Sequence, residues 1–126
     1  MITEDYVNFE VAKLLKEKGF DAQSPMIYTA DSKLIYTSVK YHNMYAVTNK
    51  YLEHYTDIIA PSQTMAMKWL REVHNIFLSI QQHMDMSYVW YAYVNGAAKG
   101  CDRESHNNTY EEACEAAIKY CLENLI

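Results

Sequence analysis

The chain has 126 residues, of which 50% are hydrophobic and 13% are aromatic, so it is long enough for one globular core and too apolar to be a disordered chain. It contains no run of about 18 apolar residues, which excludes a membrane-spanning helix in this sequence. The formal net charge is −5 and the 11 Lys and Arg residues are scattered, so we do not expect nucleic acid as a partner.

The cysteines and the first residues predict the compartment. Cys101, Cys114 and Cys121 form an odd set without CxxC spacing, which favours reduced thiols over a disulfide framework. The first residues are acidic and are not followed by the apolar segment of a signal peptide. We therefore expect a cytoplasmic protein that does not associate with a membrane.

The first predicted elements are a helix and a β-hairpin. Thr3 or Asn8 can cap the helix, and Gly19 is a natural residue for its end. Residues 26–29 and 34–37 are rich in strand-forming residues and are separated by a four-residue loop.

Residues 38–59 are predicted to be irregular, with a short helix or strand at most. Apolar side chains in this segment approach helical spacing, but several of its residues are poor helix formers. An irregular segment of this length is often functional. Its tyrosines Tyr41, Tyr45, Tyr51 and Tyr55 are therefore candidate binding residues.

A second helix and a longer hairpin follow. Pro61 suits the first turn of the helix and Asn75 its end, and the apolar stripe consists of Ala66, Trp69, Leu70 and Val73. Residues 76–81 and 88–94 alternate as strands. Tyr88, Trp90 and Val94 share one strand face, so the other face, with Val89, Tyr91 and Tyr93, needs a second cover.

The end of the chain is predicted to be a loop and a helix. Residues 95–108 are polar and contain two glycines, which is typical of a loop. The segment from Thr109 to Glu112 has the pattern of a capping box before the last helix. The predicted order is α-ββ-α-ββ-α, an α+β fold with helices packed on an antiparallel sheet. We expect one domain over residues 1–126, with 22–59 and 95–108 least regular.

Three segments carry a resemblance to other sequences. They are MITEDYVNFEVAKLLKEKGFD (1–21), APSQTMAMKWLREVHNI (60–76) and TYEEACEAAIKYCLENLI (109–126). Together they resemble a family of small uncharacterised proteins from gut Bacteroides-type genomes, their phages and integrated elements. The resemblance implies a bacterial protein encoded by a phage or mobile element, and it assigns no functional residue. The hairpin followed by TYEEA and an Ala-rich helix is also similar to HicB-like antitoxin domains.

No motif in the sequence predicts catalysis, a metal site or a cofactor. Structural zinc needs four ligands, and Cys101 and His106 form only one loose pair. The same pair lacks the orienting acid of a nucleophilic site. Trp69 is predicted to be buried, with Arg71 and His74 at the surface. Tyr91 and Tyr93 lie on one strand face, where core packing or a protein interface is favoured over a base-stacking platform because the chain is acidic.

Three functional hypotheses follow. The first is a non-enzymatic interaction module that binds a protein, or a second copy of itself, through its sheet face or its tyrosine-rich segment. The second is a nucleic-acid-linked regulator such as a HicB-like antitoxin partner, which a compact positive patch would favour. The third is an enzyme of unrecognised type, which a deep pocket with converging polar side chains would favour.

Overall fold

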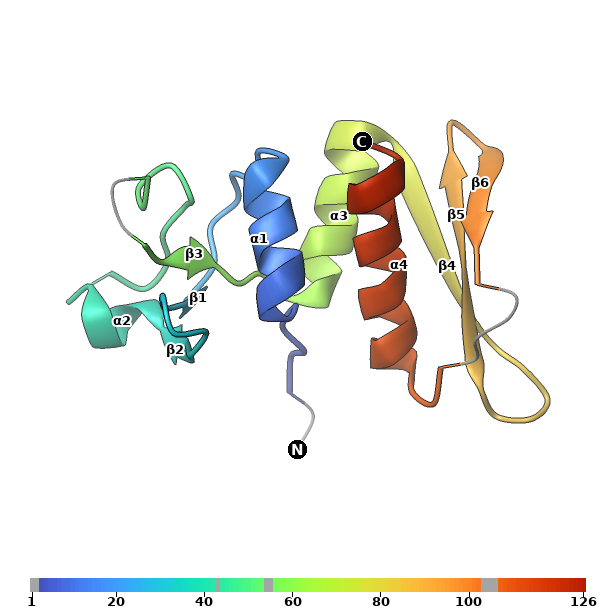
Figure 1. Ribbon diagram of the computed structural model, residues 1–126, viewed down its shortest axis with the longest axis horizontal. Helices are drawn as coiled ribbons and strands as arrows, with labels where there is room; N and C mark the ends of the chain where they lie inside the picture. The colour runs from blue at the N-terminus through green and yellow to red at the C-terminus, as the bar shows by residue number, and fades with distance from the viewer. Residues whose placement is uncertain (1–2, 43, 54–55, 103–106) are drawn as a thin grey trace. The chain divides into compact units, whose positions relative to one another are not determined.

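The computed structural model describes residues 3–42, 44–53, 56–102 and 107–126. Its backbone contacts form two compact units, Met1–Ser62 and Gln63–Ile126. Each unit combines helices with a three-stranded antiparallel sheet, which confirms the α+β class (Figure 1). The expectation of one domain over the whole chain stays a prediction.

The first unit begins with the predicted helix. The side chain of Asn8 accepts a hydrogen bond from the N–H of Val11 at 2.9 Å and so caps α1, which spans Phe9–Glu17. Gly19 follows at φ +87°, a left-handed conformation that glycine adopts without steric cost. Both features confirm the sequence signals.

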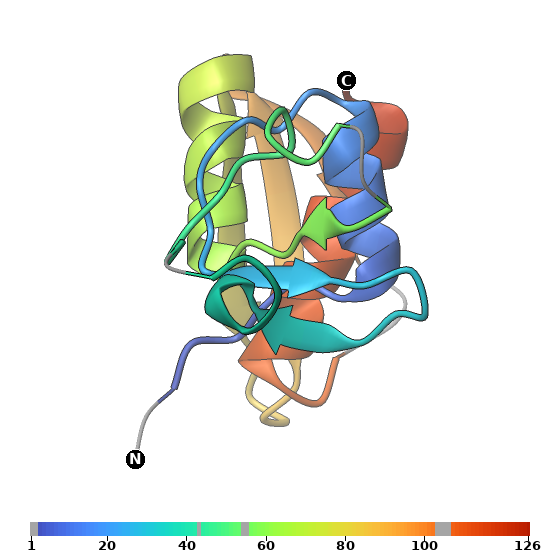
Figure 2. The ribbon, with the colours of Figure 1, turned by 90° about the vertical axis from the view of Figure 1, so that its left-hand side faces the viewer.

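The sheet of the first unit is small. The central strand β1 (Met26–Tyr28) pairs with β2 (Leu34–Tyr36) on one side and with β3 (Ile58–Ile59) on the other (Figure 2). The predicted first hairpin is therefore correct, and its strands are one residue shorter than expected. The side chains of Thr29 and Asp31 share a hydrogen bond in its loop, which lowers the pKa of Asp31.

Polar side chains organise the irregular segment 38–59. It holds the short helix α2 (Thr37–Lys40) at its start and β3 at its end, where the sequence predicts a short helix or strand at most. In between, the amide of buried Asn49 donates to the carbonyl of Phe20 at 3.1 Å, and its oxygen accepts from the N–H of Ile59 at 3.0 Å. These bonds take the place of a regular ladder.

The second unit has two helices and three longer strands. Helix α3 (Gln63–His74) leads into β4 (Ile76–Gln82), β5 (Tyr88–Val94) and β6 (Ala97–Cys101), and α4 (Tyr110–Asn124) completes it. The sheet order is β4-β5-β6, so β5 is central, as its bulky residues on both faces indicate. Both helices lie on the same side of this sheet (Figure 1).

The N-terminus of α4 has the predicted cap. The Thr109 hydroxyl accepts from the N–H of Glu112 at 3.1 Å. The Glu112 carboxylate reaches back to the N–H of Asn108 at 3.0 Å, one residue before the partner expected in a capping box. The two acidic side chains in the first turn, Glu111 and Glu112, also favour the positive end of the helix dipole.

The prediction of a loop over residues 95–108 is wrong for Ala97–Cys101, which form β6. Asn95 and Gly96 adopt φ +52° and +84°, and this is the pair of left-handed residues that a tight hairpin turn requires. The Asn-Gly dipeptide was the signal that predicts this turn, and the polar composition around it obscured it. The predicted element order therefore lacks β6, as well as the short elements α2 and β3.

The central helix confirms one buried side chain and corrects another. Trp69 is 6% exposed, as predicted, and its ring meets that of His74 edge-on with 4.7 Å between centroids. Val73 is 58% exposed and does not belong to the buried stripe. The buried positions are Gln63, Ala66, Trp69 and Leu70, so the stripe ends one turn before the helix does. His74 is half-buried rather than a surface residue.

Candidate functional site

The two faces of the β4-β5-β6 sheet carry different side chains. On the helix side, Ile76, Leu78 and Ile80 stand opposite Val94, Ala92 and Trp90, and the Trp90 ring lies 5.0 Å from that of Tyr120 on α4. Side chains of a strand alternate between faces. Phe77, Ser79 and Gln81, opposite Tyr93, Tyr91 and Val89, therefore point away from the helices.

Three aromatic side chains dominate the face away from the helices. Phe77 is 48% exposed and stands directly opposite Tyr93, while Tyr91 is the next residue on that face of β5. Tyr91 and Tyr93 are half-buried. We call Phe77, Tyr91 and Tyr93 the aromatic face. In Figure 1 neither helix of the second unit covers it. Val89 on the same face is 2% exposed, so the predicted need for a second cover applies to the two tyrosines and not to Val89.

The sequence prediction named Tyr91 and Tyr93 and missed Phe77. Its signal was present, because strict alternation along β4 already puts Phe77 on the side opposite Ile76 and Leu78. What the sequence did not supply is the register that sets Phe77 against Tyr93. That register places the three aromatic side chains on one face of the sheet.

The tyrosines of the first unit divide into a structural residue and exposed ones. The Tyr41 hydroxyl donates to Oδ2 of Asp57 at 2.5 Å, and Nζ of Lys40 lies 2.8 Å from the same oxygen. Asp57 is fully buried, so these contacts compensate for the loss of its hydration. No described residue hydrogen-bonds to its Oδ1. Tyr41 thereby ties the irregular segment to β3, with the Tyr51 ring packed edge-on at 6.0 Å.

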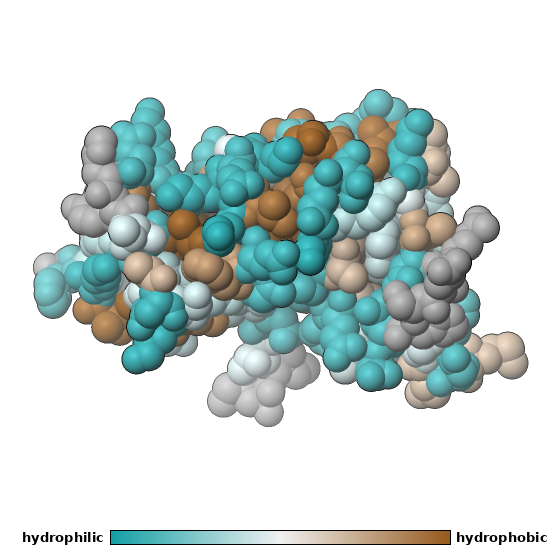
Figure 3. Space-filling view, viewed as in Figure 1, coloured by the Kyte–Doolittle hydropathy of each residue, from teal (hydrophilic) through white to brown (hydrophobic). Residues whose placement is uncertain are grey.

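Tyr45 and Tyr51 are accessible to a partner, being 82% and 45% exposed. The carbonyl of Tyr45 accepts from the buried hydroxyl of Thr37 at 2.9 Å, so its backbone is fixed beside the start of α2. Leu34, Tyr36 and Val39 are also exposed on β2 and α2, where Figure 3 shows brown surface at the lower left. We call Leu34, Tyr36, Val39 and Tyr45 the α2 patch. Tyr55 lies outside the described residues.

The thiols offer little nucleophilic chemistry. Cys114 and Cys121 are fully buried on α4, and burial raises the pKa of Cys121 to about 12. Cys101 is half-buried on β6 opposite Tyr91, and His106 lies outside the described residues. Among the residues that the structure describes, no group of three or more His, Cys, Asp or Glu side chains is arranged to hold a metal ion.

An open depression of about 380 Å³ lies in the first unit, lined by Lys13, Lys16, Glu17 and Ile58. The ammonium group of Lys13 lies 5.6 Å from the centre of the Phe9 ring, which gives it a partner outside the depression. Two lysines and one glutamate on a single helix do not form the converging polar set of an active site. No helix in the described ranges is long and apolar enough to cross a membrane.

Comparisons of the chain with protein-family models, with curated proteins and with solved structures gave no match.

Proposed function

We propose that the chain is a non-enzymatic interaction module that binds another protein through the aromatic face. The observation that carries this proposal is the 48% exposed ring of Phe77, placed opposite Tyr93 on a sheet face that neither helix of its unit covers. Tyrosine and phenylalanine are enriched at the centres of protein interfaces, where rigid rings bury a large area at small entropic cost.

The charge around the aromatic face favours a protein over a nucleic acid. Within the described parts of β4, β5 and β6, Lys99 is the sole charged side chain. A groove that follows a phosphate backbone needs several cations beside its stacking rings. A nucleic-acid-linked regulator, such as a HicB-like antitoxin partner, therefore gains no support from this surface. The enzyme hypothesis gains none from the depression beside α1.

We further propose a cellular compartment and a genetic origin for the protein. Cys114 and Cys121 are buried and form no disulfide, which is consistent with a reducing compartment, and we propose the cytoplasm. The resemblance to proteins of Bacteroides-type genomes and their phages adds the proposal of a bacterial, mobile-element origin.

Affinity capture with paired variants tests the proposed function. The wild-type chain is immobilised beside Phe77→Ser/Tyr93→Ser, and both are exposed to a bacterial lysate. Val73→Ser is the matched control, because Val73 is 58% exposed on α3 of the same unit and lies outside the aromatic face. We expect a protein that the wild type and Val73→Ser retain and the double variant loses. Titration of that purified protein should show at least about a tenfold weaker Kd for the double variant.

Three outcomes would contradict the proposal. If all three chains retain the captured protein equally, binding lies elsewhere on the molecule. If a Leu34→Ser/Tyr45→Ser variant loses the captured protein instead, the α2 patch is the binding surface. Captured material that disappears after nuclease treatment would favour the nucleic-acid hypothesis.

A further inference from the structure

The two edges of the β4-β5-β6 sheet differ in their protection against strand pairing. The β6 edge carries a bulge, where the register shifts between Ala92 and Tyr93, and it carries exposed Lys99. The Tyr120 hydroxyl also donates to the carbonyl of Lys99 at 3.2 Å. Bulges and edge lysines are the devices by which proteins prevent further strands from adding to a sheet.

The β4 edge has none of these devices. Its sequence, IFLSIQQ, contains no charge, no proline and no glycine, and all seven residues pair with β5 without a register shift. It is thus a long and regular edge strand. Such an edge is a template for another strand unless something covers it.

The backbone groups that face outward along β4 can be identified from its two ends. The N–H of Asn95 bonds to the carbonyl of Asn75 at 3.4 Å, and the N–H of His83 bonds to the carbonyl of Ser87 at 2.8 Å. Because hydrogen-bonded pairs alternate in an antiparallel ladder, the odd-numbered residues of β4 bond to β5. The N–H and C=O groups of Ile76, Leu78, Ile80 and Gln82 therefore point away from it. No hydrogen bond links them to another described residue.

The outward residues of β4 are complementary to a second copy of themselves. In antiparallel pairing about a two-fold axis at Ser79, Ile76 meets Gln82 and Leu78 meets Ile80, and each relation occurs twice. All four outward residues are then in hydrogen-bonded pairs, whereas an axis at Leu78 or Ile80 leaves some of them unpaired. Leu78 and Ile80 are half-buried in one copy and would cover each other across the contact.

The absence of charge on β4 also permits pairing with a second copy. A two-fold axis brings identical groups together, so a charged side chain at the centre of the edge would meet its own charge. The central residue of β4 is Ser79, which has a hydroxyl side chain, and the other six residues of the strand are also uncharged. From this edge we infer that the chain forms a two-fold dimer by pairing β4 with β4, which extends the sheet to six strands. This dimer is independent of whether the aromatic face binds another protein.

Sedimentation across a wide dilution range tests the dimer with a matched pair of variants. Ser79→Lys puts two like charges at the axis, while Ala98→Lys adds the same charge on exposed β6, away from the axis. We expect the wild type and Ala98→Lys to have similar dimer dissociation constants. The dissociation constant of Ser79→Lys should be at least about tenfold higher. Mixing Ser79→Lys with Ser79→Glu should restore a one-to-one dimer. Circular dichroism of dilute samples checks that each variant is folded.

Amide hydrogen exchange, resolved by residue, identifies the contact itself. The N–H groups of Leu78 and Ile80 should exchange at least about tenfold more slowly in concentrated than in dilute samples, because they are hydrogen-bonded only in the dimer. The N–H groups of Phe77 and Ser79, already bonded to β5, should change far less. A monomer mass at every concentration would overturn the inference. So would a dimer that Ser79→Lys and Ala98→Lys weaken equally, or one without protection at Leu78 and Ile80.

Discussion

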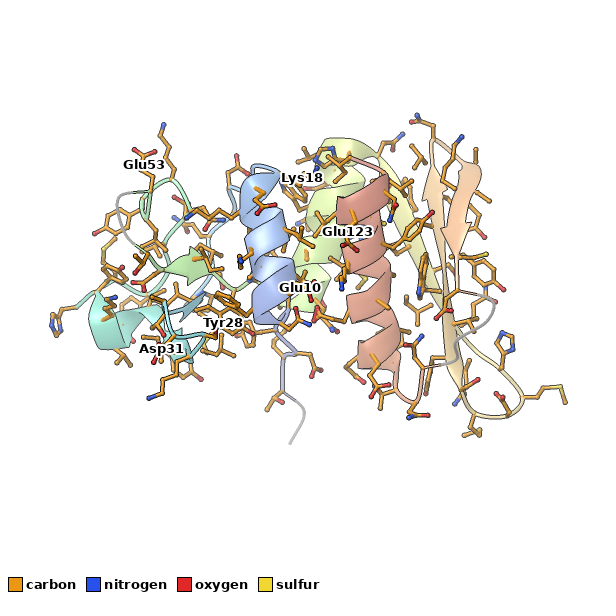
Figure 4. All side chains as sticks on the ribbon, viewed as in Figure 1. Glu10, Lys18, Tyr28, Asp31, Glu53 and Glu123 are labelled. Atoms are coloured by element: carbon orange, nitrogen blue, oxygen red, sulfur yellow. The ribbon has the colours of Figure 1, made fainter. Side chains whose placement is uncertain are left out.

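The two units build their sheets by different means. The strands of the second unit are five to seven residues long, while those of the first are two or three residues long. In the first unit, hydrogen bonds from side chains to the backbone supplement the few hydrogen bonds between the short strands. The Ser24 hydroxyl donates to the carbonyl of Ala60 at 2.8 Å, and the Tyr28 hydroxyl, labelled in Figure 4, donates to that of Val7 at 2.6 Å.

This difference teaches where stability resides in each unit. Side chain to backbone bonds between residues far apart in sequence close the first unit, so the loss of one buried polar side chain leaves backbone groups without partners. The second unit is closed by apolar layers between α3, α4 and the sheet, so the loss of one large apolar side chain leaves a cavity.

The largest effect is expected from Trp69→Ala in the second unit. Trp69 is 6% exposed, and its truncation should lower the free energy of unfolding by about 3–5 kcal/mol through lost burial and a cavity. Phe77→Ala is the control, because its 48% exposed ring should cost less than about 1 kcal/mol. Denaturant unfolding measures both. A similar cost for the two variants would mean that the layer under α3 does not carry the stability of this unit.

Asn49→Ala is the corresponding test of the first unit. It removes both the donor to Phe20 and the acceptor for Ile59, leaving two buried backbone groups unsatisfied, at a cost of about 2–4 kcal/mol. Asn124→Ala removes an exposed bond of similar length, from its amide to the carbonyl of Tyr120 at 3.1 Å, and should change stability by less than about 0.5 kcal/mol. If Asn49→Ala is as mild as its control, water replaces the lost bonds and the segment is not closed by polar contacts.

A smaller effect concerns pH and sharpens the account of the second unit. Burial raises the pKa of Cys121 from its ordinary 9.0 to about 12. In the unfolded chain this thiol ionises near the ordinary value, so between about pH 9 and 12 the unfolded state binds fewer protons and the stability contributed by Cys121 falls as pH rises.

The variant Cys121→Ala should therefore lose stability less steeply over that range than the wild type does. Val73→Ala, which removes no ionisable group from the same unit, should keep the wild-type slope. Thermal midpoints recorded across the pH series give the comparison. Identical slopes in all three chains would show that the Cys121 site admits water.

The same contrast explains how far sequence could predict the structure. In the second unit the periods of α3, β4 and β5 identify the elements, because regular packing leaves a regular apolar pattern. In the first unit the decisive contacts join Asn49 to Phe20 and Tyr41 to Asp57, and no local pattern encodes such pairs. Tyr41, a candidate binding residue from the sequence, hydrogen-bonds to Asp57 of its own chain, and its role in binding stays a prediction.

The aromatic face was partly predictable for a related reason. Alternation along β5 placed Tyr91 and Tyr93 together, since that rule needs no knowledge of neighbouring strands. Phe77 joined them only through the register between β4 and β5, which a sequence does not state. The exposure of Val73 was likewise unpredictable from its spacing, because periodicity does not show where the partner of a helix ends.

Gly100 and Tyr120 limit how this sequence can change over generations. A Cβ atom at Gly100 would lie 2.8 Å from Cζ of the Tyr120 ring, closer than van der Waals contact allows. The same ring packs against Trp90, and its hydroxyl bonds to Lys99. Any other residue at 100 therefore requires the ring at 120 to move or to shrink. Among descendants of this chain, we expect substitutions at the two positions to occur together, so that the strand glycine and the helical tyrosine coevolve.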